Sequence, residues 1–103
     1  MTESEFTRLA DAIFARIENA LNRSGTDIDY SFNGTVLELE FEDGSQIIIN
    51  RHTPNQEIWV AARSGGFHFS FQDGQWQSKR DGSELFSKLS ELVQLASGKS
   101  ILI

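Results

Sequence analysis

The sequence predicts an α+β fold, in which an antiparallel sheet of about six strands carries an N-terminal and a C-terminal helix on one face. Apolar residues recur at helical spacing near both ends of the chain, and in between they alternate with polar residues. Short turn sequences separate the alternating segments. Two one-sided helices and a one-sided sheet bury their apolar surfaces by packing together as a two-layer α/β sandwich. The 103 residues therefore form a single domain, 1–103, whose other sheet face is open to solvent.

The first expected element is a helix over residues 3–22. One apolar stripe runs along it, made of Phe6, Leu9, Ala10, Ile13, Ile17, Ala20 and Leu21. Thr2 and Glu5 have the spacing of a capping box at its start. The segment from Asn22 to Gly25 ends it.

The apolar period then changes to two, which predicts strands. The expected strands are residues 28–32, a strand with Leu37, Leu39 and Phe41, residues 45–50 and 57–62, a strand with Phe67, Phe69 and Phe71, and one with Trp76. Turns are predicted at Asn33-Gly34, Asp43-Gly44, Ser64-Gly65-Gly66 and Asp73-Gly74, with a loop around Pro54. Short turns between such strands indicate an antiparallel meander.

The side-chain directions of two strands bear on function. Asn50 belongs in water, so Gln46 and Ile48 point outward while Ile47 and Ile49 point to the core. Strand 57–62 has two possible registers, with either Trp59 or its neighbours in the core. Periodicity alone favours a buried Trp59, because large aromatic side chains usually belong to the core. An exposed Trp59 would instead make an anchor for a binding partner.

The last element is a helix over residues 84–96. Its apolar stripe is Leu85, Phe86, Leu89, Leu92, Val93 and Ala96. Asp81 or Ser83 can cap its start, and Gly98 follows its end.

Composition excludes several kinds of function. The net charge of −6 argues against binding to nucleic acids and to anionic membranes. The absence of cysteine excludes disulfides, thiolate metal sites and cysteine nucleophiles. The N-terminus lacks the basic start of a signal peptide, and no stretch is apolar enough to span a membrane. We therefore expect a cytoplasmic protein.

Acidic residues follow one stripe of the first helix and continue towards the first strand: Glu3, Asp11, Glu18, Asp27 and Asp29. We call this set the acidic ridge. Carboxylates at this density suit a hard cation or a basic protein surface, and the alternative is a solvated acidic face. A second acidic group, Glu38, Glu40, Glu42 and Asp43, is assigned to solubility and edge protection.

Nothing in the sequence predicts an enzyme. His52 and His68 have no metal-ligand spacing and are interpreted as ordinary surface residues. No nucleophile motif and no glycine-rich phosphate loop is present.

Several segments together resemble the bacterial frataxins. They are the run from Asn50 through Arg51, Pro54 and Ile58-Trp59 to Ala61, the segment Gly65-Gly66-Phe67-His68-Phe69, the later Trp76, and the start from Ser4-Glu5-Phe6 to Leu9-Ala10-Asp11. The order of elements agrees over the whole chain. The resemblance implies a frataxin-type sandwich and a role in iron–sulfur cluster assembly.

The resemblance also implies site residues and partners. Iron, as Fe²⁺ or Fe³⁺, would bind weakly at Glu3, Asp11, Glu18, Asp27 and Asp29, with no organic cofactor. A cysteine desulfurase and a scaffold protein would bind a surface with Asn50, Arg51, Trp59 and His68, which requires an exposed Trp59. The tail Ile101-Leu102-Ile103 would lie between the helices.

Some positions depart from the family pattern. Asn19, Asn22 and Arg23 stand where relatives often have carboxylates, so we expect weaker iron binding. His52 and Glu57 stand where many relatives have glutamine. The leading hypothesis is a monomeric, non-enzymatic iron-binding regulator of cluster assembly. Its acidic ridge would contact a basic patch on the desulfurase, and iron would tune that contact. A ferroxidase that stores iron and a plain binding module with incidental metal binding are the alternatives.

Overall fold

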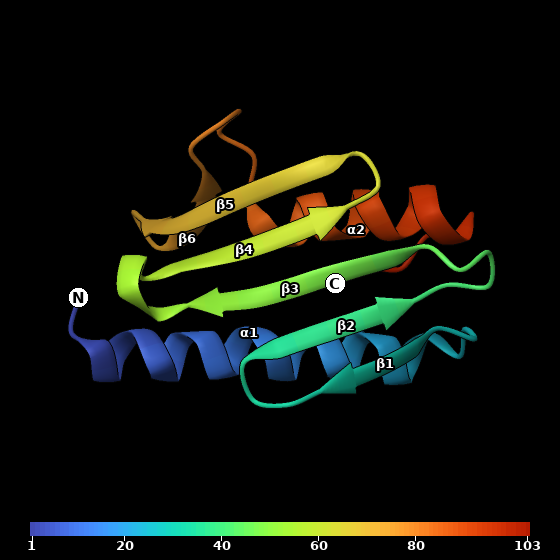
Figure 1. The fold of residues 1–103 in the computed structure, drawn as a ribbon, viewed down its shortest axis with the longest axis horizontal. Coiled ribbons are helices and arrows are strands. Elements are labelled where there is room, and N and C mark those ends of the chain that lie inside the picture. The colour runs from blue at the N-terminus through green and yellow to red at the C-terminus, as the bar shows by residue number, and fades with distance from the viewer.

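The computed structural model describes residues 1–103 and confirms the two-layer sandwich. Helix α1 (Glu3–Ser24) precedes the six strands in the sequence, and helix α2 (Leu85–Ser97) follows them. The strands are β1 (Asp29–Phe32), β2 (Val36–Glu40), β3 (Gln46–His52), β4 (Glu57–Ala62), β5 (Gly65–Gln72) and β6 (Gln75–Ser78), with a short 3₁₀ turn, η1 (Thr53–Asn55), before β4. They form one antiparallel sheet in chain order. Figure 1 looks onto the open face of the sheet, with both helices behind it.

The core lies between the sheet and the helices and contains 23 buried apolar side chains. In β3, Ile47 and Ile49 are buried, as the position of Asn50 predicted. In β4, Ile58 and Val60 are buried, whereas Trp59 lies half-buried on the open face. The register that periodicity favoured for this strand is therefore wrong, and the one implied by the family resemblance is confirmed.

The helix ends show one confirmed cap and one misassigned cap. Thr2 Oγ1 accepts from the Glu5 amide at 3.1 Å, and Glu5 Oε1 accepts from the Thr2 amide at 3.2 Å, which is the predicted capping box. At α2 the cap is Glu84, whose carboxylate accepts from the amides of Phe86 and Ser87. Neither Asp81 nor Ser83 caps α2, because these two residues bond to each other instead.

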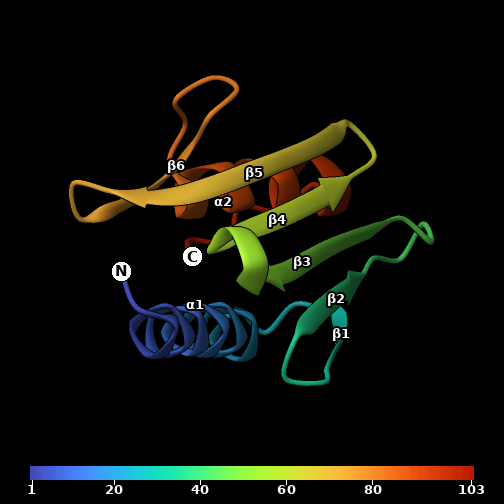
Figure 2. The same ribbon diagram turned by 60° about the vertical axis from the view of Figure 1, so that its left-hand side comes forward.

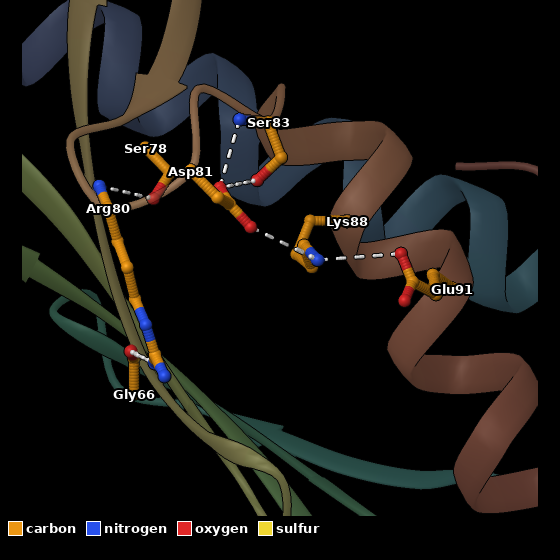
Figure 3. Close-up of polar contacts among 7 residues, drawn as sticks. All are labelled: Gly66, Ser78, Arg80, Asp81, Ser83, Lys88 and Glu91. Carbon is orange, nitrogen blue, oxygen red and sulfur yellow. Dashed lines mark hydrogen bonds and ion pairs between the residues drawn. The ribbon is translucent and has the colours of Figure 1, made fainter.

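The loop between β6 and α2 is held by a charged side-chain cluster (Figure 3). One oxygen of Asp81 accepts from the amide and the hydroxyl of Ser83, and the other faces Lys88 Nζ at 3.6 Å. These contacts, the Ser83 hydroxyl first, lower the pKa of Asp81 from 3.8 to about 2. Arg80 donates to the carbonyl of Gly66 on β5, so the loop is tied to the sheet as well as to α2.

The turns and strand ends follow the sequence closely. Asp73 and Gly74 both have positive φ, 50° and 80°, as a two-residue hairpin turn requires. Asn33 Oδ1 accepts from the amides of Thr35 and Val36 and so closes the β1–β2 turn. Strand β3 runs to His52, two residues beyond the predicted end at Asn50, which adds His52 to the sheet.

The C-terminal tail lies between the two helices, as Figure 2 shows. Ile101 and Ile103 are buried there, while Leu102 is 90% exposed. Arg16 donates to the Ile103 carbonyl at 3.1 Å, and the Ile103 amide donates to Ser90 Oγ at 3.2 Å. The expected docking of the tail is confirmed. No helix is both long and apolar enough to cross a bilayer.

Candidate cation-binding and partner-binding surfaces

The acidic ridge begins on α1 with a carboxylate that is already paired. Asp11 accepts from Arg51 Nη2, and the same guanidinium donates to the Gly34 carbonyl at 2.7 Å. The Arg51 side chain is only 10% exposed and lies over the ring of Phe14, on the helix-covered side of the sheet. Packing against α1 therefore places the Arg51 side chain away from the open face that carries Asn50, Trp59 and His68, with which it was predicted to share a partner-binding surface.

The other helix members of the ridge have no intramolecular partner. Glu3 is exposed and lines a shallow hollow with Arg8 and Asp11. Glu18 is half-buried on the same helix. Asp11 lies between Glu3 and Glu18 in the sequence, and Arg51 neutralises its charge. The negative charge of the ridge is therefore weakest at Asp11.

The two aspartates after α1 lie in different surroundings. Asp29 is on the open sheet face, directly opposite Glu40 of β2, and the two line one hollow together with Glu38. Asp27 precedes β1 and lines another hollow with Glu42 and Asp43. Asp27 therefore lies outside the strand that carries Asp29, because β1 begins only at Asp29.

The carboxylates divide into two groups by their contacts. Seven of them serve the fold through hydrogen bonds or ion pairs: Glu5, Asp11, Asp43, Glu57, Asp81, Glu84 and Glu91. The ridge members Glu3, Glu18, Asp27 and Asp29 make no such contact, and neither do Glu38, Glu40, Glu42 and Asp73. No three His, Cys, Asp or Glu side chains are placed to hold one metal ion. A cation on this surface would be held by one or two carboxylates and by water.

The remaining predicted partner residues share one row of the open face. The sheet register places Asn50 of β3 opposite Trp59 of β4, and Trp59 opposite His68 of β5. The His68 ring stacks on the indole with centroids 4.2 Å apart and planes within 9°. The His52 ring stacks on the indole as well, at 3.8 Å and 8°. Trp59 is therefore the middle ring of a three-ring stack across β3, β4 and β5.

A buried carboxylate lies beside this stack. Glu57 is 3% exposed, and its Oε1 accepts from the indole Nε1 of Trp59 at 2.9 Å. Its other oxygen pairs with Lys79 Nζ at 2.6 Å. Burial alone raises the pKa of Glu57, but the hydrogen bonds from Lys79 and Trp59 outweigh burial and lower it.

Sequence reasoning missed three members of this arrangement: His52, Glu57 and Lys79. The two histidines, interpreted from the sequence as ordinary surface residues, are both stacked on the Trp59 indole in the structure. Residues 57 and 59 lie on the same side of β4, so the period of two in a strand could have predicted that Glu57 is a neighbour of Trp59. Lys79 follows β6 and had no signal, since its partner lies 22 positions earlier in the chain.

Comparison with known proteins agrees with this geometry. Residues 1–99 match the frataxin-like domain. The chain is 50% identical over 103 residues to the iron-sulfur cluster assembly protein CyaY of Neisseria meningitidis serogroup B, covering 100% of this chain and 96% of that protein. The frataxin from Psychromonas ingrahamii is 38% identical, with a TM-score of 0.93 over 98% of this chain and 96% of that one.

A more distant structure carries a metal. The trimeric frataxin from the yeast Saccharomyces cerevisiae, complexed with ferrous iron, is 29% identical. It superposes with a TM-score of 0.71 over 96% of this chain and 88% of the yeast chain. The full-length match, the sheet order and the exposed row around Trp59 agree with one another, and the chain belongs to the frataxin family.

Proposed function

We propose that this protein acts in iron–sulfur cluster assembly as a non-enzymatic, iron-binding regulator of the cysteine desulfurase. Its curated relatives are iron-sulfur cluster assembly proteins, and a structural neighbour is complexed with ferrous iron. The scaffold protein is the second proposed partner. The proposed role is cytoplasmic and the proposed active form is a monomer.

One observation carries the proposal: seven carboxylates on α1, around β1, on β2 and in the turn after β2 have no partner within the protein. The oxygen atoms of such carboxylates are free to bind a cation or to pair with a basic surface. Like charges placed opposite each other, as Asp29 and Glu40 are, destabilise a sheet unless something binds them. A bound cation or a basic partner would relieve this repulsion.

The structure also favours one part of the ridge over another. Asp29 and Glu40 are adjacent across two strands, so the two can approach one ion. Asp11 is the poorest candidate ligand, because Arg51 both occupies an oxygen and repels a cation. We therefore propose the β1–β2 pair as the strongest cation position and the helix acids as weaker ones.

An anaerobic Fe²⁺ titration followed by amide NMR tests this proposal. The test variant is Asp29→Asn with Glu40→Gln. The matched control is Asp73→Asn with Glu91→Gln, which removes the same charge elsewhere on the surface. Paramagnetic broadening is expected around Asp29 and Glu40 in the wild type and the control, and is expected to be lost in the test variant. Equal broadening in all three proteins would contradict the proposed position.

The ferroxidase alternative predicts a different result. Iron oxidation at a protein site is typical of multi-ligand centres buried in a helix bundle. The carboxylates of this chain lie on the surface instead. Oxygen uptake on adding Fe²⁺ is expected to match that of buffer. Catalytic uptake that is lost in the Asp29→Asn, Glu40→Gln variant would favour the enzyme instead.

A further inference from the structure

The turn between β1 and β2 carries the one asparagine of the chain that is followed by glycine. Asn33 and Gly34 are both exposed, at the end of the β1–β2 hairpin and at the edge of the sheet (Figure 1). Gly34 has a φ of 94°, and an added Cβ would meet nothing within 4 Å. Its amide nitrogen is therefore open to close approach by a neighbouring group. The other asparagines precede residues that have a side chain: Asn19, Asn22, Asn50 and Asn55.

The Asn33 side chain is folded over the peptide that follows it. Its Oδ1 accepts from the amide of Thr35 at 2.9 Å and from the amide of Val36 at 2.8 Å. The ring closed by the first of these bonds contains both Cγ of Asn33 and the amide nitrogen of Gly34. The Gly34 N–H donates to no group of the protein. The carbon and the nitrogen are thus held in one short ring, and nothing within the protein blocks the nitrogen.

We propose that Asn33–Gly34 is a site of spontaneous covalent modification, at which the Gly34 amide nitrogen attacks Cγ of Asn33. The N–Cγ bond forms, the Cγ–Nδ2 bond breaks, and Nδ2 leaves as ammonia together with the Gly34 amide proton. Water then opens the resulting succinimide ring. Cleavage of the N–Cγ bond leaves an aspartate at position 33, and cleavage of the bond to the backbone carbonyl carbon leaves an isoaspartate. Water is the only co-reactant.

The turn assists this reaction through the two amides that donate to Oδ1. This oxygen gains negative charge when Cγ becomes tetrahedral, and its donors lie at the distances typical of an oxyanion hole. Hydrogen bonds that strengthen as charge develops accelerate the attack. Because the turn is exposed to water, the gain over an unfolded chain is expected to be about fivefold, well below that of a buried oxyanion hole.

The product changes the charges around Arg51. Arg51 Nη2 contacts the Gly34 carbonyl at 2.7 Å, and the same guanidinium pairs with Asp11. A carboxylate formed one residue from this carbonyl would compete with Asp11 for Arg51. An aspartate keeps the acceptor that closes the turn, whereas an isoaspartate lengthens the backbone of the turn, which sets the strand register. The release of Asp11 as a cation ligand rests on the proposed function, but the modification itself does not.

The first test follows the modification by mass spectrometry. The wild type is incubated at mildly alkaline pH, both folded and in urea, and is then digested with trypsin. The peptide 24–51 contains Asn33 and Asn50, so fragmentation compares the two positions directly. Replacement of NH₂ by OH is expected at Asn33 and not at Asn50, about fivefold faster in the folded chain than in urea. Enzymatic methylation of the new α-carboxyl group detects the isoaspartate.

The matched control is Asn33→Ser, which keeps an oxygen acceptor for the turn but has no carbonyl carbon to attack. It is expected to show no modification of peptide 24–51 under the same conditions. An unmodified Asn33 in the wild type would overturn the site. A rate in the folded chain equal to or below the rate in urea would overturn the assistance by the turn.

The second test measures the competition for Arg51. The double-mutant cycle of Arg51→Met and Asp11→Asn is carried out by urea unfolding in three backgrounds: wild type, Asn33→Asp and Asn33→Ser. The coupling energy is expected to fall to about half in Asn33→Asp, and to stay unchanged in Asn33→Ser, which adds no charge. Equal coupling in all three backgrounds would overturn the competition. Neither test contains iron or the desulfurase, so a wild type that binds neither would refute the proposed function and leave both results standing.

Discussion

The position of Arg51 predicts that this residue stabilises the fold and does not contact a partner. Its guanidinium joins three parts of the chain: Asp11 on α1, the Gly34 carbonyl in the β1–β2 turn, and β3 itself. The chosen perturbation is Arg51→Met. It keeps an unbranched apolar stem over Phe14 but removes the charge and the donors.

The expected cost follows from the contacts that are lost. A hydrogen bond from a charged donor contributes about 1.5–3 kcal/mol, with the lower figure appropriate to the exposed Gly34. The ion pair with Asp11, whose side chain is 61% exposed, adds about 0.2–1 kcal/mol. Removing the buried Nε, which has no partner, offsets part of this loss. The free energy of unfolding should fall by about 1.5 kcal/mol, which lowers Tm by roughly 6–12 °C.

A double-mutant cycle in urea checks this prediction. Arg51→Met, Asp11→Asn and the double variant are compared with the wild type, with unfolding followed by tryptophan fluorescence. The coupling energy between Arg51 and Asp11 should be about 0.5–1 kcal/mol. The reasoning is refuted if the coupling is zero, or if Arg51→Met keeps wild-type stability but loses affinity for the desulfurase. The second result would restore the role predicted from the sequence.

Three further predictions concern stability. Thr2→Ala removes the α1 cap and should lower the free energy of unfolding in urea by about 1 kcal/mol. The control Thr7→Ala, at an exposed position within the helix, should lower it much less. Ile103→Ala should lower the free energy of unfolding by about 2 kcal/mol, whereas Leu102→Ala should leave it unchanged, because Ile103 is buried and Leu102 is exposed. Thermal melts of the two variants check this difference. Asp81 has a pKa lowered from 3.8 to about 2, so it stabilises the fold above pH 3.8 and loses this effect as the pH falls through 2. Asp81→Asn should therefore lower stability at pH 7 and flatten its decline between pH 4 and 2, as measured by urea unfolding at several pH values.

Much of the fold could be predicted from the sequence because its signals are local. The stripe of α1, the capping box at Thr2 and Glu5, and the alternation of Ile47 and Ile49 each depend on residues only a few positions apart. The same holds for the positive φ of Asp73 and Gly74, since turn residues are chosen by backbone geometry. These signals determine the element order and the antiparallel meander.

The candidate site could be predicted only in part. The sequence shows that the ridge residues are acidic, but it does not show which of their carboxylates are paired within the fold. Asp11 and Arg51 are 40 positions apart, and Glu57 and Lys79 are 22 apart. Which carboxylates remain unpaired therefore depends on how α1 and the loop after β6 pack against the sheet. Glu38 and Glu40 of β2, which the sequence assigns to solubility, lie beside Asp29 because the strand register places β1 next to β2.

The sequence by itself determined the two-layer sandwich, the ends of most elements and an excess of surface carboxylates, because hydrophobic period, turn chemistry and charge are properties of neighbouring residues. Only the tertiary structure decided that Trp59 faces outward between two imidazole rings and that Arg51 faces inward against Phe14. Both outcomes depend on strand register and helix packing. A shift of one residue in register reverses the face of every side chain in a strand, and in β4 periodicity alone favoured the wrong face for Trp59.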